Sequence, residues 1–148
     1  STFERIPAER AIYNTTKAFK SYGSFDENDP MVKIINGNWN AGDYTEFVKK
    51  YIEEHYMKEI QLGDLALVAH VSPSYLSVRF KKEMGISFTE YLVTYRVNKA
   101  RELLANSSAP YKEIAQAVGY TDYVQFSKMF KKRTGLTPGE YHKIVFKT

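Results

Sequence analysis

The amino-acid sequence predicts an all-α fold, and three observations support this prediction. From Asp43 onward, apolar residues recur at intervals of three and four positions, which is the spacing of an amphipathic helix. Residues that cap helices and glycines that end them interrupt this spacing, and no stretch of any length alternates as a β-strand does. The sequence also repeats itself at a distance of about 50 residues, so it contains two copies of one helical unit.

Three helices are predicted in the first half of this region, over about residues 43–56, 62–69 and 73–84. Asp43 is a candidate N-cap of the first of them. Ser72 and Pro73 have the residue types typical of an N-cap and of the first helical position, so they mark the start of the third helix. Gly85 is expected to end this helix, because glycine adopts the left-handed conformation of a C-cap without strain.

Four more helices are predicted in the second half, over about residues 87–106, 110–118, 123–134 and 138–145. Ser87 and Glu90 have the spacing of a capping box, and so have Thr137 and Glu140. Asp122 is the expected N-cap of the helix that follows it. The region from residue 43 to residue 145 is therefore predicted to form seven helices.

Residues 1–43 give a weaker pattern than the rest of the chain. A helix from about Ala8 to Tyr22 is expected there, followed by a loop and by turn signals around Trp39. The segment has a net charge of −1, whereas residues 44–148 have a net charge of +5. We expect residues 1–43 to be a linker or the remnant of an absent sensor or receiver domain, and residues 44–148 to form the folded domain. The lack of an initiator methionine agrees with a fragment or a processed chain.

The composition argues against several classes of function. The chain has no cysteine, which rules out disulfides, thiolate metal sites and cysteine nucleophiles. Its histidines, His55, His70 and His142, lack the spacing of metal ligands. Glu53 and Glu54 are neighbours on a helix and point in different directions, so they do not form a catalytic pair. We therefore expect no cofactor, no metal, no enzyme activity and no membrane partner, in a cytoplasmic protein.

The repeat has the plan of a helix-turn-helix unit. In both copies a short helix is followed by a tight turn and a longer helix, which is the order of elements in that motif. His70 stands in the first turn where the second has Gly119, and histidine tolerates a left-handed backbone better than most residues. The matching pairs are Leu65-Ala66 with Ile114-Ala115, Leu76-Ser77 with Phe126-Ser127, Phe80-Lys81-Lys82 with Phe130-Lys131-Lys132, and Gly85 with Gly135.

The longer helices of the two copies have similar outward faces. Residues at i, i+3, i+4 and i+7 form one stripe on each helix, opposite its apolar face. Hydroxyl, amide, basic and small apolar groups suit the base edges, thymine methyl groups and phosphates of DNA. The first stripe holds Ser74, Ser77, Val78 and Lys81, and the second holds Val124, Ser127, Lys128 and Lys131, flanked by Tyr123 and Gln125. The candidates for phosphate contact are Lys81, Lys82, Lys131, Lys132 and Arg133.

Two alternatives to DNA binding remain open. An ordinary solvated face would also carry serines and lysines, and the twelve tyrosines of the chain would suit a helical protein–protein interaction module without DNA binding. Salt-sensitive binding to duplex DNA distinguishes these classes. Arg96 and Arg101 lie within the helix of residues 87–106 and either contact phosphates or brace the two lobes through an ion pair or a snorkelling side chain, and bracing is the preferred interpretation.

The repeated segments resemble the C-terminal DNA-binding domain of the AraC/XylS family. The resemblance covers about residues 44–146 and implies a transcription regulator with a seven-helix, bilobed domain. In this arrangement the helix of residues 87–106 joins the lobes, and two recognition helices enter successive major grooves. The residues that carry the resemblance are Ser72-Pro73-Ser74-Tyr75-Leu76-Ser77, Phe80 to Gly85, Tyr95-Arg96, Ala100-Arg101, Leu103-Leu104, Ile114-Ala115, Val118-Gly119-Tyr120, Phe126 to Lys132, Gly135 and Thr137-Pro138.

The resemblance also implies which side chains face the bases and which partners bind. Position 78 is often basic in relatives, so Val78 implies contact with a methyl group or a smaller share in specificity. The implied partners are double-stranded DNA, RNA polymerase and a sensor or receiver domain, as in response regulators. The implied base-facing residues are Ser74, Ser77 and Val78 in the first helix, and Tyr123, Val124, Gln125, Ser127 and Lys128 in the second.

Overall fold

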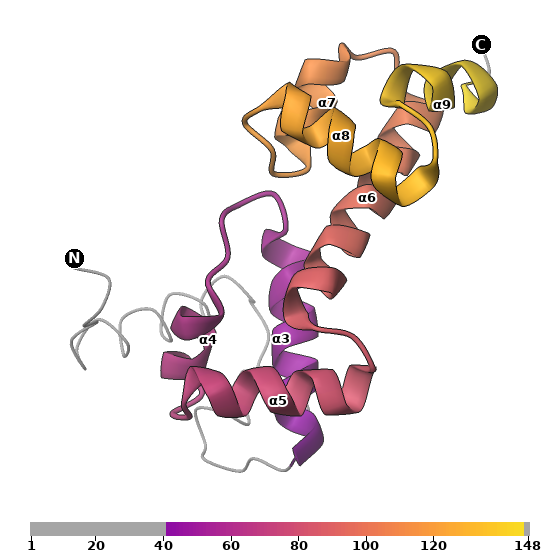
Figure 1. Ribbon diagram of the computed structural model, residues 1–148. Helices are drawn as coiled ribbons and strands as arrows, with labels where there is room; N and C mark the ends of the chain where they lie inside the picture. The colour runs from indigo at the N-terminus through magenta and orange to yellow at the C-terminus, as the bar shows by residue number, and fades with distance from the viewer. Residues whose placement is uncertain (1–40, 147–148) are drawn as a thin grey trace. The chain divides into compact units, whose positions relative to one another are not determined.

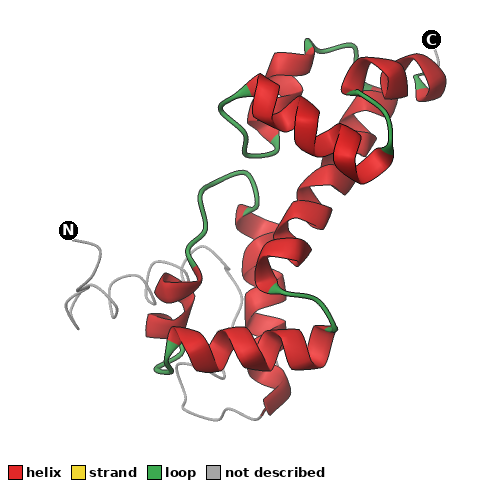
Figure 2. Ribbon diagram, viewed as in Figure 1, coloured by secondary structure: helices red, strands yellow, loops and turns green. Residues whose placement is uncertain are grey.

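The computed structural model describes residues 41–146, which form seven helices. No strand occurs in that range (Figure 2), so the prediction of an all-α fold is confirmed. The helix expected between Ala8 and Tyr22 and the turns around Trp39 lie outside the described residues. The helices are α3 (Ala41–His55), α4 (Leu62–Val68), α5 (Pro73–Met84), α6 (Phe88–Asn106), α7 (Tyr111–Ala117), α8 (Tyr123–Thr134) and α9 (Pro138–Val145) (Figure 1).

The predicted boundaries hold to within a few residues, with one correction at the start of α3. Asp43 is not the N-cap, because the helix already begins at Ala41 and Asp43 lies in its first turn. An acidic residue is stabilising there too, since the free N–H groups give a helix N-terminus a partial positive charge. Sequence alone does not distinguish the cap from the first turn, because the same residue types favour both positions.

The described residues divide into two compact units. The first unit holds residues 41–51 and 61–88 and contains most of α3 together with α4 and α5. Side chains of these three helices form its core, and Tyr75 of α5 packs edge-on against Tyr44 of α3 with ring centroids 5.6 Å apart. The buried residues are Phe47, Val48, Leu65, Ala66, Ala69, Leu76 and Phe80.

The second unit holds residues 52–60 and 89–146. In it α7, α8 and α9 lie along the C-terminal half of α6 (Figure 1). Tyr141 of α9 completes the core by packing edge-on against Phe130, with ring centroids 5.5 Å apart. The core residues come from α6, α7 and α8 and the turn between the last two: Val97, Ala100, Leu104, Ile114, Ala115, Val118, Phe126 and Phe130.

Capping side chains fix the starts of three helices, as predicted. The Ser72 hydroxyl accepts a hydrogen bond of 3.0 Å from the backbone N–H of Tyr75 at the start of α5. Thr137 and Glu140 form a complete capping box at the start of α9, where the Thr137 N–H donates to the Glu140 carboxylate at 2.9 Å. This hydrogen bond holds the pKa of the Glu140 carboxyl below its usual value. At the start of α8, the Asp122 carboxylate accepts hydrogen bonds from two backbone N–H groups.

Candidate nucleic-acid interface

The turns between the paired helices have the geometry of a helix-turn-helix motif. His70, between α4 and α5, has a φ of 58°, and Gly119, between α7 and α8, has a φ of 106°. Both copies therefore reverse the chain through one residue with positive φ, and the prediction that His70 takes the place of a glycine is confirmed. Each turn positions the longer helix that follows it, α5 in the first unit and α8 in the second.

The buried side of α5 fixes which residues the helix exposes. Leu76 and Phe80 are fully buried in the first unit. The side chains on the opposite face are exposed, and Val78 retains 67 % of its accessible surface although it is apolar. A valine side chain open to water on a helix face is available for contact with a ligand. The exposed face contains the predicted residues Ser74, Ser77, Val78 and Lys81.

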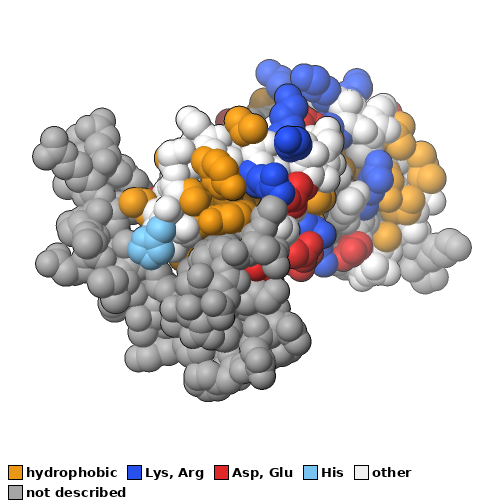
Figure 3. Space-filling view, turned by 90° about the horizontal axis from the view of Figure 1, so that it is seen from below, with side chains coloured by type: hydrophobic (Ala, Val, Ile, Leu, Met, Phe, Trp, Pro, Cys, Tyr) orange, Lys and Arg blue, Asp and Glu red, His pale blue; other side chains and the backbone are white. Residues whose placement is uncertain are grey.

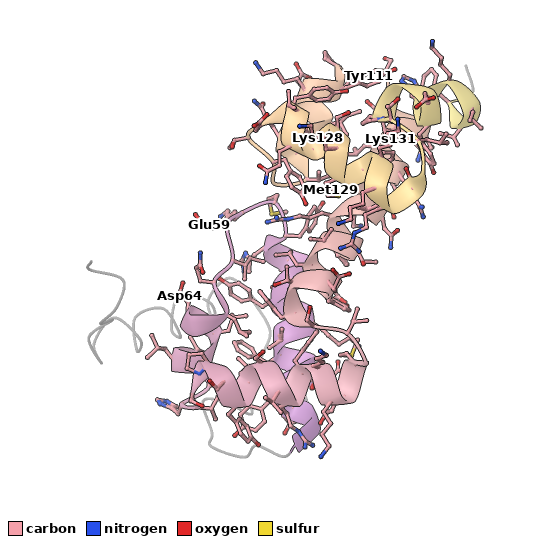
Figure 4. The ribbon with its side chains drawn as sticks, viewed as in Figure 1. Glu59, Asp64, Tyr111, Lys128, Met129 and Lys131 are labelled. Carbon is pink, nitrogen blue, oxygen red and sulfur yellow. The ribbon has the colours of Figure 1, made fainter. Side chains whose placement is uncertain are left out.

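The helix α8 repeats this arrangement with one difference. Phe126 and Phe130 are fully buried, and Val124 retains 60 % of its surface. Tyr123 and Ser127 are half-buried, and the Tyr123 ring packs against Phe126 with centroids 6.2 Å apart. Tyr123 therefore belongs partly to the core and exposes only part of its ring. The exposed residues of the predicted stripe and its flank are Val124, Gln125, Lys128 and Lys131, and Figure 4 labels the last two on α8.

The predicted phosphate contacts separate into two groups. Lys81, Lys82, Lys131 and Lys132 are exposed, and none of the ion pairs of the described residues includes them. Arg133 instead forms an ion pair of 2.9 Å between its Nη2 and the Glu90 carboxylate of α6. It follows Val124 by about two and a half helical turns, so it lies on the side of α8 opposite the exposed stripe.

An ion pair also forms between two residues of α5. Arg79 Nη2 is 2.7 Å from the Glu83 carboxylate, one turn further along the same helix. Glu83 of the first copy matches Arg133 of the second, so both copies hold an ion pair at this position of the longer helix. The face shown in Figure 3 has Lys and Arg side chains next to exposed apolar ones, with some Asp and Glu. Basic groups next to apolar groups are suited to nucleic acid.

Arg96 of α6 braces the second unit. Its Nε donates a hydrogen bond of 2.8 Å to the carbonyl oxygen of Tyr56, and its Nη2 donates one of 2.8 Å to that of Lys58. Its guanidinium also lies 5.3 Å from the centroid of the Tyr120 ring, in a cation–π contact. Arg96 therefore has a bracing role, but it acts through hydrogen bonds and a cation–π contact inside the second unit, and none of the ion pairs of the described residues includes it.

Gly119 is needed for this brace. A Cβ atom at this position would lie 2.8 Å from the carbonyl oxygen of Tyr56 and 3.0 Å from Cζ of Arg96. Such distances are shorter than van der Waals contact, and the φ of 106° also disfavours any side chain. The turn before α8 therefore requires glycine for two reasons, and the sequence indicated only the left-handed backbone.

The sequence reasoning missed one exposed aromatic side chain. Tyr75 retains 46 % of its surface near the start of α5. It matches Gln125 when the two copies are aligned at a distance of 50 residues, and Gln125 was included in the predicted set. Because the two copies match, the choice of Gln125 on the second helix also indicates Tyr75 at the equivalent position of the first.

The described residues offer neither a metal site nor a membrane-spanning helix. Residues 41–146 contain no group of three or more His, Asp and Glu side chains that could hold a metal ion. None of the helices within this range is long and apolar enough to cross a membrane.

Two helix-turn-helix units, each with a basic and partly apolar outward face, define the class of a DNA-binding domain of a transcription regulator. The helix-turn-helix domain family matches residues 65–144, which is more than half of the chain. The chain belongs to this family and, within it, to the AraC type.

Solved structures of the same kind are similar over most of the described residues. The C-terminal domain of AraT, a response regulator from Geobacillus stearothermophilus, is 37 % identical with a TM-score of 0.69, over 71 % of this chain and 88 % of that one. A regulator with an AraC-type DNA-binding domain from Chromobacterium violaceum is 26 % identical with a TM-score of 0.63, over 70 % and 95 %. The DNA-binding domain of AdpA, solved in complex with a target DNA, is 26 % identical with a TM-score of 0.63, over 68 % and 90 %.

Curated relatives of this chain are longer proteins. The chain spans 15 % to 53 % of the length of eight curated relatives that it matches. The similarity therefore concerns the helix-turn-helix domain and not the remainder of those proteins.

Proposed function

We propose that the chain binds double-stranded DNA sequence-specifically through α5 and α8, which enter successive major grooves, and that it regulates transcription in this way. The observation that carries the proposal is the matching exposed stripe on the two helices. Each stripe lies opposite two fully buried side chains, Leu76 and Phe80 on α5, Phe126 and Phe130 on α8. Packing does not require such a match, because none of the stripe residues is buried.

Two further facts support this mode of binding. The similar AdpA domain was solved on a target DNA. The helix α6, which lies between α5 and α7 in the sequence, has 19 residues and is therefore about 28 Å long, close to the ~34 Å between major grooves on one face of DNA. A chain with one reading helix on each side of such a linker can contact two grooves as a monomer.

The proposal assigns different roles to the side chains of the two helices. Gln125 and Lys128 can make directed hydrogen bonds to adenine and guanine edges. Ser74, Ser77 and Val78 can make only short polar or methyl contacts. Additional base contacts are assigned to Val124, Ser127 and the exposed part of Tyr123, and phosphate contacts to Lys81, Lys82, Lys131 and Lys132. Arg133 is assigned to its ion pair with Glu90.

The partners of the whole protein follow from the same proposal. AraT is a response regulator, and its C-terminal domain is similar to this chain. We propose that a sensor or receiver domain precedes the DNA-binding domain, that RNA polymerase is the target of regulation, and that the protein acts in the cytoplasm.

The salt dependence of DNA binding tests the proposal. For the 148-residue chain, the logarithm of affinity for an arbitrary duplex should fall linearly with the logarithm of salt concentration, by about 0.9 for each phosphate contacted. Lys131→Ala should reduce the slope by up to about one unit for all sequences, because one phosphate contact is lost. Lys99→Gln is the matched control, since Lys99 pairs with Glu102 on α6, away from the proposed interface. A slope near zero for the unaltered chain would exclude nucleic acid and favour a protein-interaction module.

A further inference from the structure

A small pocket lies between α6 and α8 in the second unit. It has a volume of about 140 Å³ and is lined by Thr94, Val97, Asn98, Arg101 and Arg133. The first four of these residues lie on one face of α6, and Arg133 comes from the last turn of α8. Two guanidinium groups, an amide, a hydroxyl and one apolar side chain therefore surround the same space.

Arg101 is the unusual member of this set. Its Nε is buried and makes no hydrogen bond, and no ion pair of the described residues includes it. A buried polar atom without a partner costs about 1–3 kcal/mol, and more when the group carries a charge. A guanidinium in this state has N–H donors available for an anion.

The two arginines of the pocket carry more positive charge than the one carboxylate paired with them, that of Glu90, neutralises. Arg133 pairs with Glu90, and this is the one carboxylate paired with either arginine among the described residues. Two guanidinium groups lining one small space repel each other unless an anion lies near both. One additional anionic group with the charge of a carboxylate would balance the second guanidinium.

We propose that this pocket binds a carboxylate. The planar fork of an arginine matches the two oxygens of a carboxylate, and such charge-assisted hydrogen bonds are about twice as strong as neutral ones. Asn98 and Thr94 supply further donors at the exposed edge of the pocket, and Val97 contacts the carbon chain of the ligand. The carboxylate comes either from a free small acid or from an acidic side chain of a partner protein, and the chemistry of the site is the same for both.

The ligand is not a phosphate of the duplex that α8 contacts. Arg133 lies on the side of α8 opposite the exposed stripe that runs from Val124 to Lys131, so this pocket faces away from the groove. This step rests on the proposed function, whereas carboxylate binding itself is measurable without DNA.

Nuclear magnetic resonance of the arginine Nε–Hε groups tests the site in the ¹⁵N-labelled 148-residue chain. Sodium acetate, sodium succinate and a blocked Gly-Glu-Gly peptide are titrated at constant ionic strength kept with sodium chloride. The resonances of Arg101 and Arg133 should shift saturably, while that of Arg96, which is already hydrogen bonded to two carbonyl groups, should not move. Tighter binding of succinate than of the peptide indicates a free acid as the natural ligand, and the reverse indicates a protein side chain.

Variants separate this site from general charge effects. Arg101→Gln should weaken acetate binding by about tenfold or more, because a charged hydrogen-bond donor is lost. Lys99→Gln, which removes the same charge from α6 outside the pocket, should leave acetate binding unchanged. Asn98→Ala provides a second variant at an exposed position, with an expected weakening of severalfold.

Two results would overturn the inference. One is that acetate, succinate and the peptide shift the Arg101 resonance no more than sodium chloride does. The other is that a duplex bound by the chain displaces acetate in competition, which would make this pocket a phosphate contact. Failure of DNA binding with intact carboxylate binding would contradict the proposed function alone.

Discussion

Arg96 and Arg101 lie on the same helix but have opposite surroundings. Arg96 donates to two backbone carbonyl groups and lies over the Tyr120 ring, whereas Arg101 makes no hydrogen bond through its buried Nε. The two side chains should therefore contribute very differently to the stability of the second unit.

Replacing these arginines by methionine tests this difference. Arg96→Met removes two hydrogen bonds from a charged donor and leaves the carbonyl groups of Tyr56 and Lys58 without that donor. We expect the free energy of unfolding to fall by about 1.5–3 kcal/mol. Arg101→Met should not lower it in buffer without carboxylates, because no hydrogen bond is lost and a buried donor without a partner is removed. Urea unfolding followed by circular dichroism measures both values, and equal losses would contradict the bracing role of Arg96.

The residue-level predictions from sequence succeeded where local pattern decides the outcome. The stripes on α5 and α8 follow from helical spacing, because a helix that buries Phe126 and Phe130 exposes the opposite face, which carries Val124, Lys128 and Lys131. The ion pair of Arg133 could not be predicted, because its partner Glu90 lies 43 positions earlier in the chain. The unpaired Nε of Arg101 likewise depends on packing between helices that local pattern does not describe.

A single N-cap side chain stabilises the start of each of the helices α5 and α8. Asp122 accepts hydrogen bonds of 2.9 and 3.4 Å from the N–H groups of Val124 and Gln125, and Ser72 accepts one from Tyr75. The caps therefore position the first turns of α8 and α5, where the proposed base contacts begin.

Removal of these caps should have a measurable cost in stability. We expect Asp122→Ala to lower the free energy of unfolding by about 1 kcal/mol, and Ser72→Ala by a similar or smaller amount. The larger loss should occur at Asp122, because a charged acceptor that serves two donors is removed. Asp122→Asn is the control that keeps the capping oxygen. An unchanged urea midpoint for Asp122→Ala would show that the cap does not stabilise α8.

His55, the last residue of α3, makes the stability of the protein depend on pH. Burial lowers the pKa of His55, and the nearby Lys58 lowers it further. Because the folded protein disfavours protonation, stability is complete above the unfolded pKa of about 6.5 and decreases as the pH falls below it. His55→Gln should make this decrease smaller between pH 7.5 and pH 5. Urea midpoints at the two pH values measure it, and an identical decrease in both proteins would exclude His55 as the cause.

At the scale of the whole molecule, the sequence predicted the helices of residues 41–146 and their division into two lobes, and missed only where the boundary between the lobes falls. All seven helices were found, because spacing, caps and glycines are local signals. Residues 52–60 follow the first helix in sequence, yet they belong to the second unit. Arg96 explains why residues 52–60 belong to the second unit, because it donates hydrogen bonds to the carbonyl groups of residues 56 and 58 and so holds them to the helix α6.

The central claim is that α5 and α8 read bases and do so unequally. The stripe of α8 offers Gln125 and Lys128, and a good bidentate pair contributes ~1–3 kcal/mol of discrimination. The stripe of α5 offers hydroxyl and methyl groups, which discriminate less. The half-site under α8 should therefore be the more stringent one.

The most direct test is binding to every single-base variant of a duplex selected from random sequences, at one salt concentration. Wild type, Gln125→Ala, Lys128→Ala and Val78→Ala are compared. The account predicts that the first two variants relax preference at one or two base pairs of one half-site, while Val78→Ala weakens a thymine preference in the other. A uniform loss of affinity with every base preference unchanged would contradict the claim that these side chains read the sequence.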